Sequence, residues 1–254
     1  CKVTRKAFDD VVRCLKTAKN EREVEGAFNA RARLEGNDAG YNVIAAAGAN
    51  ACILHWGRND GRIKKNDLVL LDAGVELNDL YTADITRTIP SSGKFTATQR
   101  VVYDLVRDAQ VAAIEAVKPG NHFLDPHWAA MKVLAHGLAD LGLLPCSAEE
   151  ALLPENQFYK RYTLHGTSHM LGMDVHDCAH ARIERYRNGP LEPGMVLTIE
   201  PGLYFQEDDL TVPAKYRGIG IRIEDDVLVT AKGHRVLSDV PRDSDDVEAW
   251  MAEL

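Results

Sequence analysis

The sequence predicts an α+β domain in which helices lie outside a mostly antiparallel sheet. Amphipathic patterns with recognisable helix ends alternate with short apolar runs of strand length, several of which end near a glycine. The chain has 254 residues and is 45% hydrophobic, which is enough to bury one large core. We therefore expect residues 1–254 to form a single domain built from layers of helices and strands.

The expected helices are marked by capping residues. Thr96 and Gln99 form a capping box at the start of a long amphipathic helix, which should stop before Pro119. Asp125 and Pro126 predict the N-cap and the first position of the next helix. Three more helices are expected to begin near Thr4, Glu21 and Ser244, the last with the serine as its cap.

Two apolar runs share one design. Residues 67–74 (DLVLLDAG) and 195–202 (MVLTIEPG) are each of strand length and end in an acid, Asp72 or Glu200, close to a glycine. A glycine at a strand end allows the loop to bring backbone close to an ion. Both acids are therefore candidate metal ligands.

Two other segments alternate with the period of two that is typical of strands. In residues 218–224 isoleucines alternate with other residues, so that Arg222 and Glu224 share one face. The same period places Asp84 and Thr86 on one face of another strand. Thr86 is therefore expected to hydrogen-bond a ligand group.

The two halves of the chain repeat one pattern. Each half has a histidine, a polar turn, an apolar strand that ends in an acid, and a second strand that bears another acid. We expect a pseudo-twofold cleft to which each half contributes two oxygen ligands, with chance similarity of two strand hairpins as the alternative. In chain order the repeated positions are His55, Asp72 and Asp84, then His176, Glu200 and Glu224.

Four acids and one histidine from these segments predict a two-metal site. Buried acids repel one another and lose hydration, and a cation offsets both costs. Oxygen-rich coordination with one imidazole suits manganese better than a thiolate zinc site would, and no cysteine has a metal-binding spacing. The candidate ligands are Asp72, Asp84, His169, Glu200 and Glu224.

Three motifs carry a family resemblance. The sequences HGTSHMLGMDVHD (165–177), LEPGMVLTIEPGLY (191–204) and YRGIGIRIEDDVLVT (216–230) resemble the Xaa-Pro aminopeptidase and prolidase branch of the pita-bread metallopeptidases. The resemblance runs from about Glu35 to the C-terminal helix. It implies the pita-bread fold of creatinase and the aminopeptidases, with two divalent ions over a curved antiparallel sheet. Manganese is favoured, with cobalt and zinc as alternatives.

The resemblance also implies how the ligands are shared. Asp72 and Glu200 would anchor the site, and Asp84 would bind one ion through both oxygens. His169 would cap one ion, and Glu224 would bridge the two. Two ions can activate a shared water as the nucleophile, so a metal-bridging hydroxide is the expected attacking group.

Further residues are expected to act beside the metals. Glu200 is our candidate for moving a proton from the water to the leaving nitrogen. The resemblance assigns His55, His165 and His176 as accessory histidines that donate to the peptide carbonyl or steady the oxyanion. Arg222 would hold the charge network around the ligands. The alternatives are structural histidines, and an arginine that only balances the charge of an acid.

The expected reaction is hydrolysis of the Xaa-Pro bond at the N-terminus of a peptide. An Xaa-Pro dipeptidase is the alternative, and aminopeptidase is preferred because residues 216–230 read closer to that group. A metal-free hydrolase of creatinase type or a non-catalytic binding module would lack ligand acids, and none is replaced here. Tyr41 precedes a run of small residues and is read either as part of the pocket or as an edge-strand tyrosine.

Composition narrows the partners and the compartment. The net charge of −8 and the absence of a basic stripe argue against nucleic acid, and no apolar run is long enough for a membrane span. Five cysteines without a framework spacing favour reduced thiols and the cytoplasm. We expect a proline-containing peptide as substrate and a homodimer. Because the chain opens on Cys1 within a helical pattern, we also expect that an N-terminal domain of a longer protein is absent.

Overall fold

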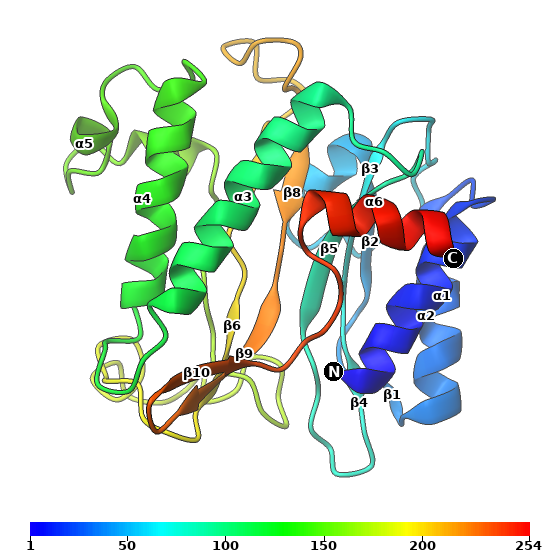
Figure 1. Cartoon of the computed structure of the whole chain (residues 1–254), viewed down its shortest axis with the longest axis horizontal. Helices are drawn as coiled ribbons and strands as arrows, with labels where there is room; N and C mark the ends of the chain where they lie inside the picture. The colour runs from blue at the N-terminus through cyan, green and yellow to red at the C-terminus, as the bar shows by residue number, and fades with distance from the viewer.

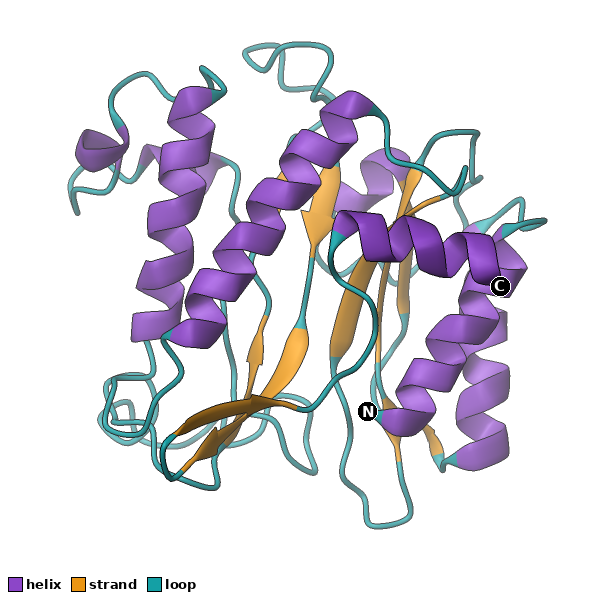
Figure 2. Cartoon of the chain, viewed as in Figure 1, coloured by secondary structure: helices purple, strands orange, loops and turns teal.

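A computed structural model describes residues 1–254 and shows strands backed by helices on one side (Figure 1). In Figure 2 long helices lie in front of the strands and to either side of them, and loops connect the elements around the edges. The helices are α1 (Lys2–Leu15), α2 (Glu21–Glu35), α3 (Ala97–Glu115), α4 (Asp125–Asp140), α5 (Ala148–Ala151) and α6 (Ser244–Glu253), with short 3-10 helices η1 (Gly48–Cys52) and η2 (Phe158–Arg161). The strands are β1 (Asp38–Ala39), β2 (Ile44–Ala47), β3 (Leu68–Ala73), β4 (Val75–Glu76), β5 (Ile85–Pro90), β6 (Val196–Ile199), β7 (Gly202–Tyr204), β8 (Gly220–Arg222), β9 (Asp225–Thr230) and β10 (Gly233–Val236).

The capping box of α3 is present as predicted. The Thr96 hydroxyl accepts from the Gln99 amide, and the Gln99 side chain accepts from the Thr96 amide. α4 begins one residue earlier than predicted, with Asp125 as its first residue. The Asp125 carboxylate accepts from the backbone of His122, so the acid closes the preceding turn and does not cap the helix.

The prediction that Ser244 caps the last helix is wrong. Asp243 is the N-cap of α6 and Ser244 is its first residue, with no side-chain capping hydrogen bond. The Ser244 hydroxyl instead accepts a hydrogen bond from Arg100 on α3. The serine therefore joins two helices.

Every strand pairing in the structure is antiparallel. The three-stranded groups have the orders β2-β3-β5 and β10-β9-β6, and two-stranded groups pair β7 with β8 and β1 with β4. This arrangement, together with the helices on one side, confirms the predicted α+β class. None of the helices has the length and apolar character needed to pass through a lipid bilayer.

The predicted repeat is visible in the strand pairs. In the first half β3 pairs with β5, and in the second half β6 pairs with β9. Asp72 lies near the end of β3 and Asp84 directly precedes β5, while Glu200 directly follows β6 and Glu224 directly precedes β9. A helix pair precedes each strand pair, α1–α2 in the first half and α3–α4 in the second.

Two hydrophobic cores lie on either side of a polar seam. The larger core packs α3 and α4 against the second-half strands, and the smaller packs α1, α2 and α6 against the first-half strands. At the seam the Glu224 amide donates to the Thr86 carbonyl, and the Thr88 hydroxyl bonds both backbone groups of Arg222. The fully buried Arg87 pairs with Asp225 at 2.7 Å. The seam therefore joins the halves through hydrogen bonds, and the polar cleft opens along it.

Candidate metal centre and active site

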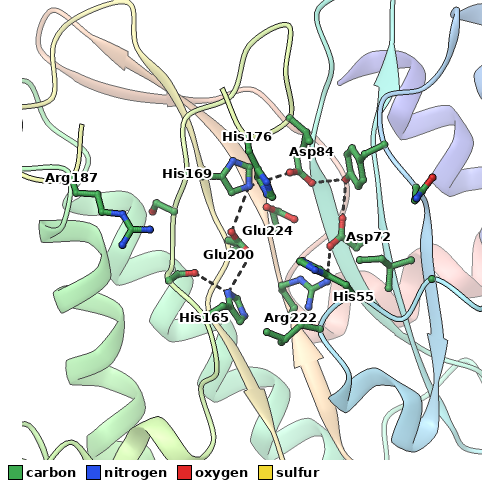
Figure 3. A pocket seen from close by; sticks show the side chains of 18 residues that line it. His55, Asp72, Asp84, His165, His169, His176, Arg187, Glu200, Arg222 and Glu224 are labelled. Carbon is green, nitrogen blue, oxygen red and sulfur yellow. Dashed lines mark hydrogen bonds and ion pairs between the residues drawn. The ribbon is translucent and has the colours of Figure 1, made fainter. Parts of the chain in front are cut away.

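A cleft of about 520 Å³ lies at the seam and collects every residue that the sequence singled out for the site (Figure 3). Its walls come from β2, β3 and β8, from the residues that directly precede β5 and β9 and directly follow β6, and from the loops that carry the histidines. The predicted side chains that line it are Asp72, Asp84, His169, Glu200 and Glu224, with His55, His165, His176 and Arg222 around them.

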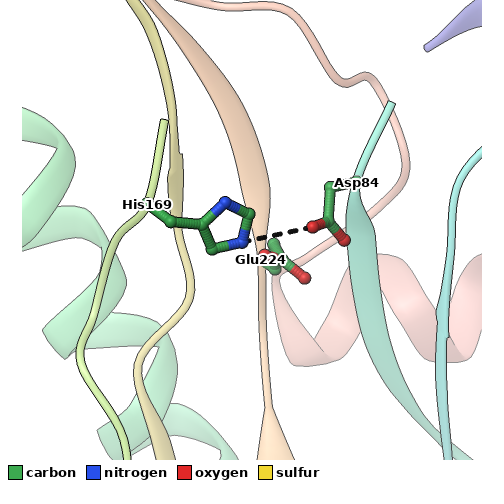
Figure 4. A group of neighbouring side chains, drawn as sticks. All are labelled: Asp84, His169 and Glu224. Atoms are coloured by element: carbon green, nitrogen blue, oxygen red, sulfur yellow. Dashed lines mark ion pairs between the residues drawn. The ribbon is translucent and has the colours of Figure 1, made fainter. Parts of the chain in front are cut away.

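Three predicted ligands form the tightest group in the cleft. Asp84, His169 and Glu224 each offer one ligand atom, and these atoms lie within 4.8 Å of one another (Figure 4). His169 Nε2 is 3.3 Å from Asp84 Oδ2 and 3.6 Å from Glu200 Oε1. A cation among these atoms would meet oxygen from both halves of the fold.

Neighbouring groups hold the ligands in orientations that suit a metal. His169 Nδ1 lies 3.1 Å from the Met170 carbonyl, and this contact directs Nε2 toward the carboxylates. The Thr86 hydroxyl donates to Glu224 Oε2 at 2.6 Å, as the strand period predicted. These supporting contacts fix the ligand atoms before any ion is bound.

Tyr41 lies in the cleft and contacts two acids, which resolves the two readings of this residue. Its hydroxyl oxygen is 2.8 Å from Asp72 Oδ1 and 2.5 Å from Asp84 Oδ1. A phenol carries one hydrogen and can donate to only one of them. The second contact places two oxygens together, so it needs a proton on a carboxyl group or a cation nearby.

Arg222 binds Asp72 more closely than it binds Glu224. Its Nη2 donates to Asp72 Oδ2 at 2.5 Å, and its Nε lies 3.3 Å from the Thr86 hydroxyl. The arginine is 3% exposed, so its charge acts in a poorly solvated region. It balances one acid and leaves the other carboxylates of the cleft without a basic partner of equal strength.

The electrostatics of the cleft reflect this excess of acid. Burial raises the pKa of Glu200 to about 8, although His169 and Arg222 oppose the shift. Burial and the neighbouring acids also raise the pKa of Glu224, and burial raises that of Asp72 despite Arg222. Divalent cations would supply the missing positive charge and keep these groups ionised, so the donor set fits a metal site.

The histidine ligand shows the same excess of negative charge. Burial alone would lower the pKa of His169, but its contact with Asp84 and the charge of Glu200 raise the pKa to about 9. Without a cation the imidazole therefore holds a proton where a metal would bind. Protons and metal ions compete for this nitrogen.

The three accessory histidines have different surroundings. His165 uses both ring nitrogens, with Nδ1 2.8 Å from the Gly166 carbonyl and Nε2 2.7 Å from the Tyr204 hydroxyl. Burial lowers its pKa to about 3, so it is neutral. The His176 ring lies 4.5 Å from the His169 ring, and His55 makes no side-chain hydrogen bond and is exposed to the cleft.

Sequence reasoning missed three polar residues beside the site. The Tyr204 hydroxyl links His165 to Arg222, whose Nη1 donates to it at 3.0 Å. Asp226 accepts from the Asp84 amide across the seam. Arg187 also lines the cleft. The only local signal for Asp226 was the run of three consecutive acids that begins at Glu224.

The fold and this cluster define a class of protein, the pita-bread metallopeptidases. Residues 1–231 match metallopeptidase family M24, and the chain belongs to this family. This result confirms the family resemblance in the sequence. The similarity to solved aminopeptidase P structures, given next, confirms the predicted fold.

Within the family the chain is similar to Xaa-Pro aminopeptidases. It is 59% identical over 254 residues to Xaa-Pro aminopeptidase 1 of Streptomyces coelicolor, which covers 99% of this chain and 51% of that protein. It is 43% identical over 212 residues to Xaa-Pro aminopeptidase of Escherichia coli, covering 83% of this chain and 47% of that one. The chain spans about half the length of the curated relatives it matches.

Solved structures agree with this relationship. The structure of Pseudomonas aeruginosa aminopeptidase PepP superposes with a TM-score of 0.91 at 40% identity, over 99% of this chain and 57% of that one. Aminopeptidase P from Escherichia coli with the inhibitor Pro-Leu gives a TM-score of 0.92 at 37% identity, over 99% and 56%. A zinc-substituted form of the Escherichia coli enzyme in complex with product gives a TM-score of 0.90 at 37% identity, over the same shares of the two chains.

Proposed function

We propose that this chain is the catalytic domain of a metal-dependent Xaa-Pro aminopeptidase, which removes the first residue of a peptide when proline is second. The observation that carries the proposal is the convergence of four carboxylates and one imidazole in a single cleft. The names of the relatives support proline-directed cleavage.

We propose that Asp72, Asp84, His169, Glu200 and Glu224 hold two divalent cations, with manganese preferred. When bound, the cations polarise the scissile carbonyl and lower the pKa of water. Arg222 orients Asp72 through their 2.5 Å contact and opposes the effect of burial on the pKa of Asp72. The Thr86 hydroxyl orients Glu224.

The contacts of Glu200 support a role in proton transfer. Its Oε2 lies 3.4 Å from His165 Nδ1, and its Oε1 lies 3.6 Å from His169 Nε2. A carboxylate at this point can take a proton from the attacking water and pass it to the leaving nitrogen. Because Tyr204 and the Gly166 carbonyl occupy both nitrogens of His165, that histidine orients its neighbours.

His55 and His176 remain free to face the substrate. Neither makes a side-chain hydrogen bond within the protein, and both line the cleft. A ring N–H of either imidazole could donate to the peptide carbonyl or to the oxyanion that develops from it. Ile44, Leu54 and Val175 provide an apolar lining that suits a pyrrolidine ring.

The experiment that tests the proposal uses three peptides with the manganese-loaded protein. Cleavage is compared for an Xaa-Pro-Yaa tripeptide, an Xaa-Pro dipeptide and an Xaa-Ala-Yaa control. Cleavage of the tripeptide alone supports the aminopeptidase. Cleavage confined to the dipeptide would make the chain a dipeptidase, and equal cleavage of the control would remove proline specificity.

The predicted homodimer and the cytoplasmic location stay predictions. The structure contains five unpaired cysteines. A measurement of molecular mass in solution, with a reporter fusion for location, would decide both.

A further inference from the structure

Glu21 is a fully buried acid with no basic partner. It is the first residue of α2, and its two carboxylate oxygens accept four hydrogen bonds. Oε1 accepts from the Ala47 amide at 2.7 Å and Asn50 Nδ2 at 2.8 Å. Oε2 accepts from Trp56 Nε1 and the Gly61 amide, each at 2.7 Å. All four donors belong to residues 47–61.

This segment also carries His55 into the cleft. It runs from the end of β2 through η1 and then without regular structure to Gly61. His55 has no side-chain hydrogen bond of its own, so its position depends on its neighbours. The nearest anchored neighbour is Trp56, whose indole is bound to Glu21.

Gly61 shows that the segment is closely fitted to this carboxylate. A side chain at Gly61 would place its Cβ 2.7 Å from Glu21 Oε1, closer than such atoms approach in proteins. The glycine is therefore required for the close approach, independently of the hydrogen bonds.

We propose that Glu21 is a positioning residue that holds His55 in the cleft by binding Trp56. The inference rests on the proposed function, in which His55 faces the substrate. Only a carboxylate fits this role, because each oxygen faces two donors. A glutamine would turn its amide hydrogens toward one donor pair, and an aspartate is one methylene too short to keep all four contacts.

A purely structural role would give a different result. In that case Glu21 only fastens α2 to the first-half strands, and its loss lowers stability without changing the kinetics of the folded protein. A positioning role predicts that the kinetic effect depends on His55. The two readings are separated by a double-mutant cycle.

Trp56→Phe is the test variant because it removes the indole donor and keeps an aromatic ring. Trp250→Phe is the matched control: its Nε1 donates to Asp9 Oδ1 at 2.6 Å, so the same kind of bond is lost, and Trp250 does not line the cleft. Glu21→Gln is the stronger second variant if Trp56→Phe has little effect on the segment.

Turnover is measured in the whole chain with His55 and with His55→Ala. Trp56→Phe is expected to lower kcat/KM about 5- to 10-fold with His55 present, and less than about twofold with His55→Ala. Trp250→Phe should leave kcat/KM unchanged in both. Equal losses in the two backgrounds, or an equal loss in Trp250→Phe, would overturn the proposal.

A second measurement does not depend on peptidase activity. Arg58 is exposed and lies two residues beyond Trp56, so trypsin cleavage after it reports the order of the segment. Trypsin should cleave the Trp56→Phe and Glu21→Gln variants after Arg58 faster than it cleaves the Trp250→Phe variant. An unchanged rate of trypsin cleavage in both variants would overturn the proposal that Glu21 anchors the segment through Trp56. If the unmodified protein is inactive on the tripeptide, the proposed function is refuted instead.

Discussion

Replacement of Thr86 by valine tests whether Glu224 is a metal ligand. The substitution keeps the shape of a fully buried side chain and removes the hydroxyl that donates to Glu224 Oε2 at 2.6 Å. Glu224 is 1% exposed, so water cannot replace the lost donor. A hydrogen bond to a charged group contributes about 1.5–3 kcal/mol.

We expect Thr86→Val to weaken metal binding about 10- to 100-fold, the usual effect of losing a group that orients a ligand. This range corresponds to about 1.4–2.7 kcal/mol of binding free energy, close to the contribution of the lost bond. The measurement is manganese affinity by competition with a chelator, followed by the metal content of the protein.

Thr88→Val is the matched control for this experiment. Thr88 is also fully buried, lies on the same strand and face, and bonds the backbone of Arg222 but no predicted ligand carboxylate. Both variants should lose about 1–3 kcal/mol of stability, because each leaves a buried polar group without its partner. If metal affinity fell equally in both, or stayed unchanged in Thr86→Val, the assignment of Glu224 would be refuted.

Three further predictions concern the charges of the cleft. Arg222→Ala should lower metal retention and destabilise the protein by about 3–5 kcal/mol, because the buried Asp72 loses its partner; unchanged metal content and melting temperature would contradict this. Glu200→Gln should weaken metal binding and, at saturating manganese, lower kcat about 100-fold or more; near-normal turnover in the metal-loaded variant would exclude the proton transfer. The metal-free protein should lose stability as pH rises: the folded pKa of Glu200, about 8, and that of His169, about 9, exceed the unfolded values of 4.5 and 6.5. Their bound protons therefore stabilise the fold at low pH, and this contribution is lost between about pH 5 and 9. With a chelator present, the melting temperature should fall as pH rises through that window, and it should change less when manganese is bound. A melting temperature that rises with pH in the presence of the chelator would contradict the assignment.

The acids that line the cleft could be predicted from the sequence because each lies in a local pattern. Asp72 and Glu200 end apolar runs of strand length, and Glu224 lies in an alternating strand. The same alternation placed Thr86 beside a ligand. Such patterns depend on neighbours within a few residues, so they are readable without the fold.

The missed residues act through distant partners. Glu21 binds donors 26 to 40 positions away, and Asp226 binds the amide of Asp84 across 142 positions. Neither spacing leaves a mark in the local sequence, and an acid in the first turn of a helix reads as a favourable charge at the helix N-terminus. Their roles depend on the packing of the two halves.

The helix starts marked by capping residues were predictable to within one residue. The capping box of Thr96 was correct because two side chains and two backbone groups agree on one position. Asp243 and Ser244 are both good capping residues, so the sequence does not choose between them. Arg100, which is 144 positions from Ser244, takes the serine hydroxyl and leaves Asp243 at the N-cap.

Since each half of the fold supplies two of the acidic side chains in the cleft, occupancy by cations and docking of the halves are thermodynamically linked. A change that strengthens cation binding also strengthens the docking of the two halves, and the reverse holds. If the cleft binds cations as proposed, a cell short of the metal would contain a looser molecule, more open to proteases along the seam. Abundance of the protein could thus follow metal supply with no dedicated regulator.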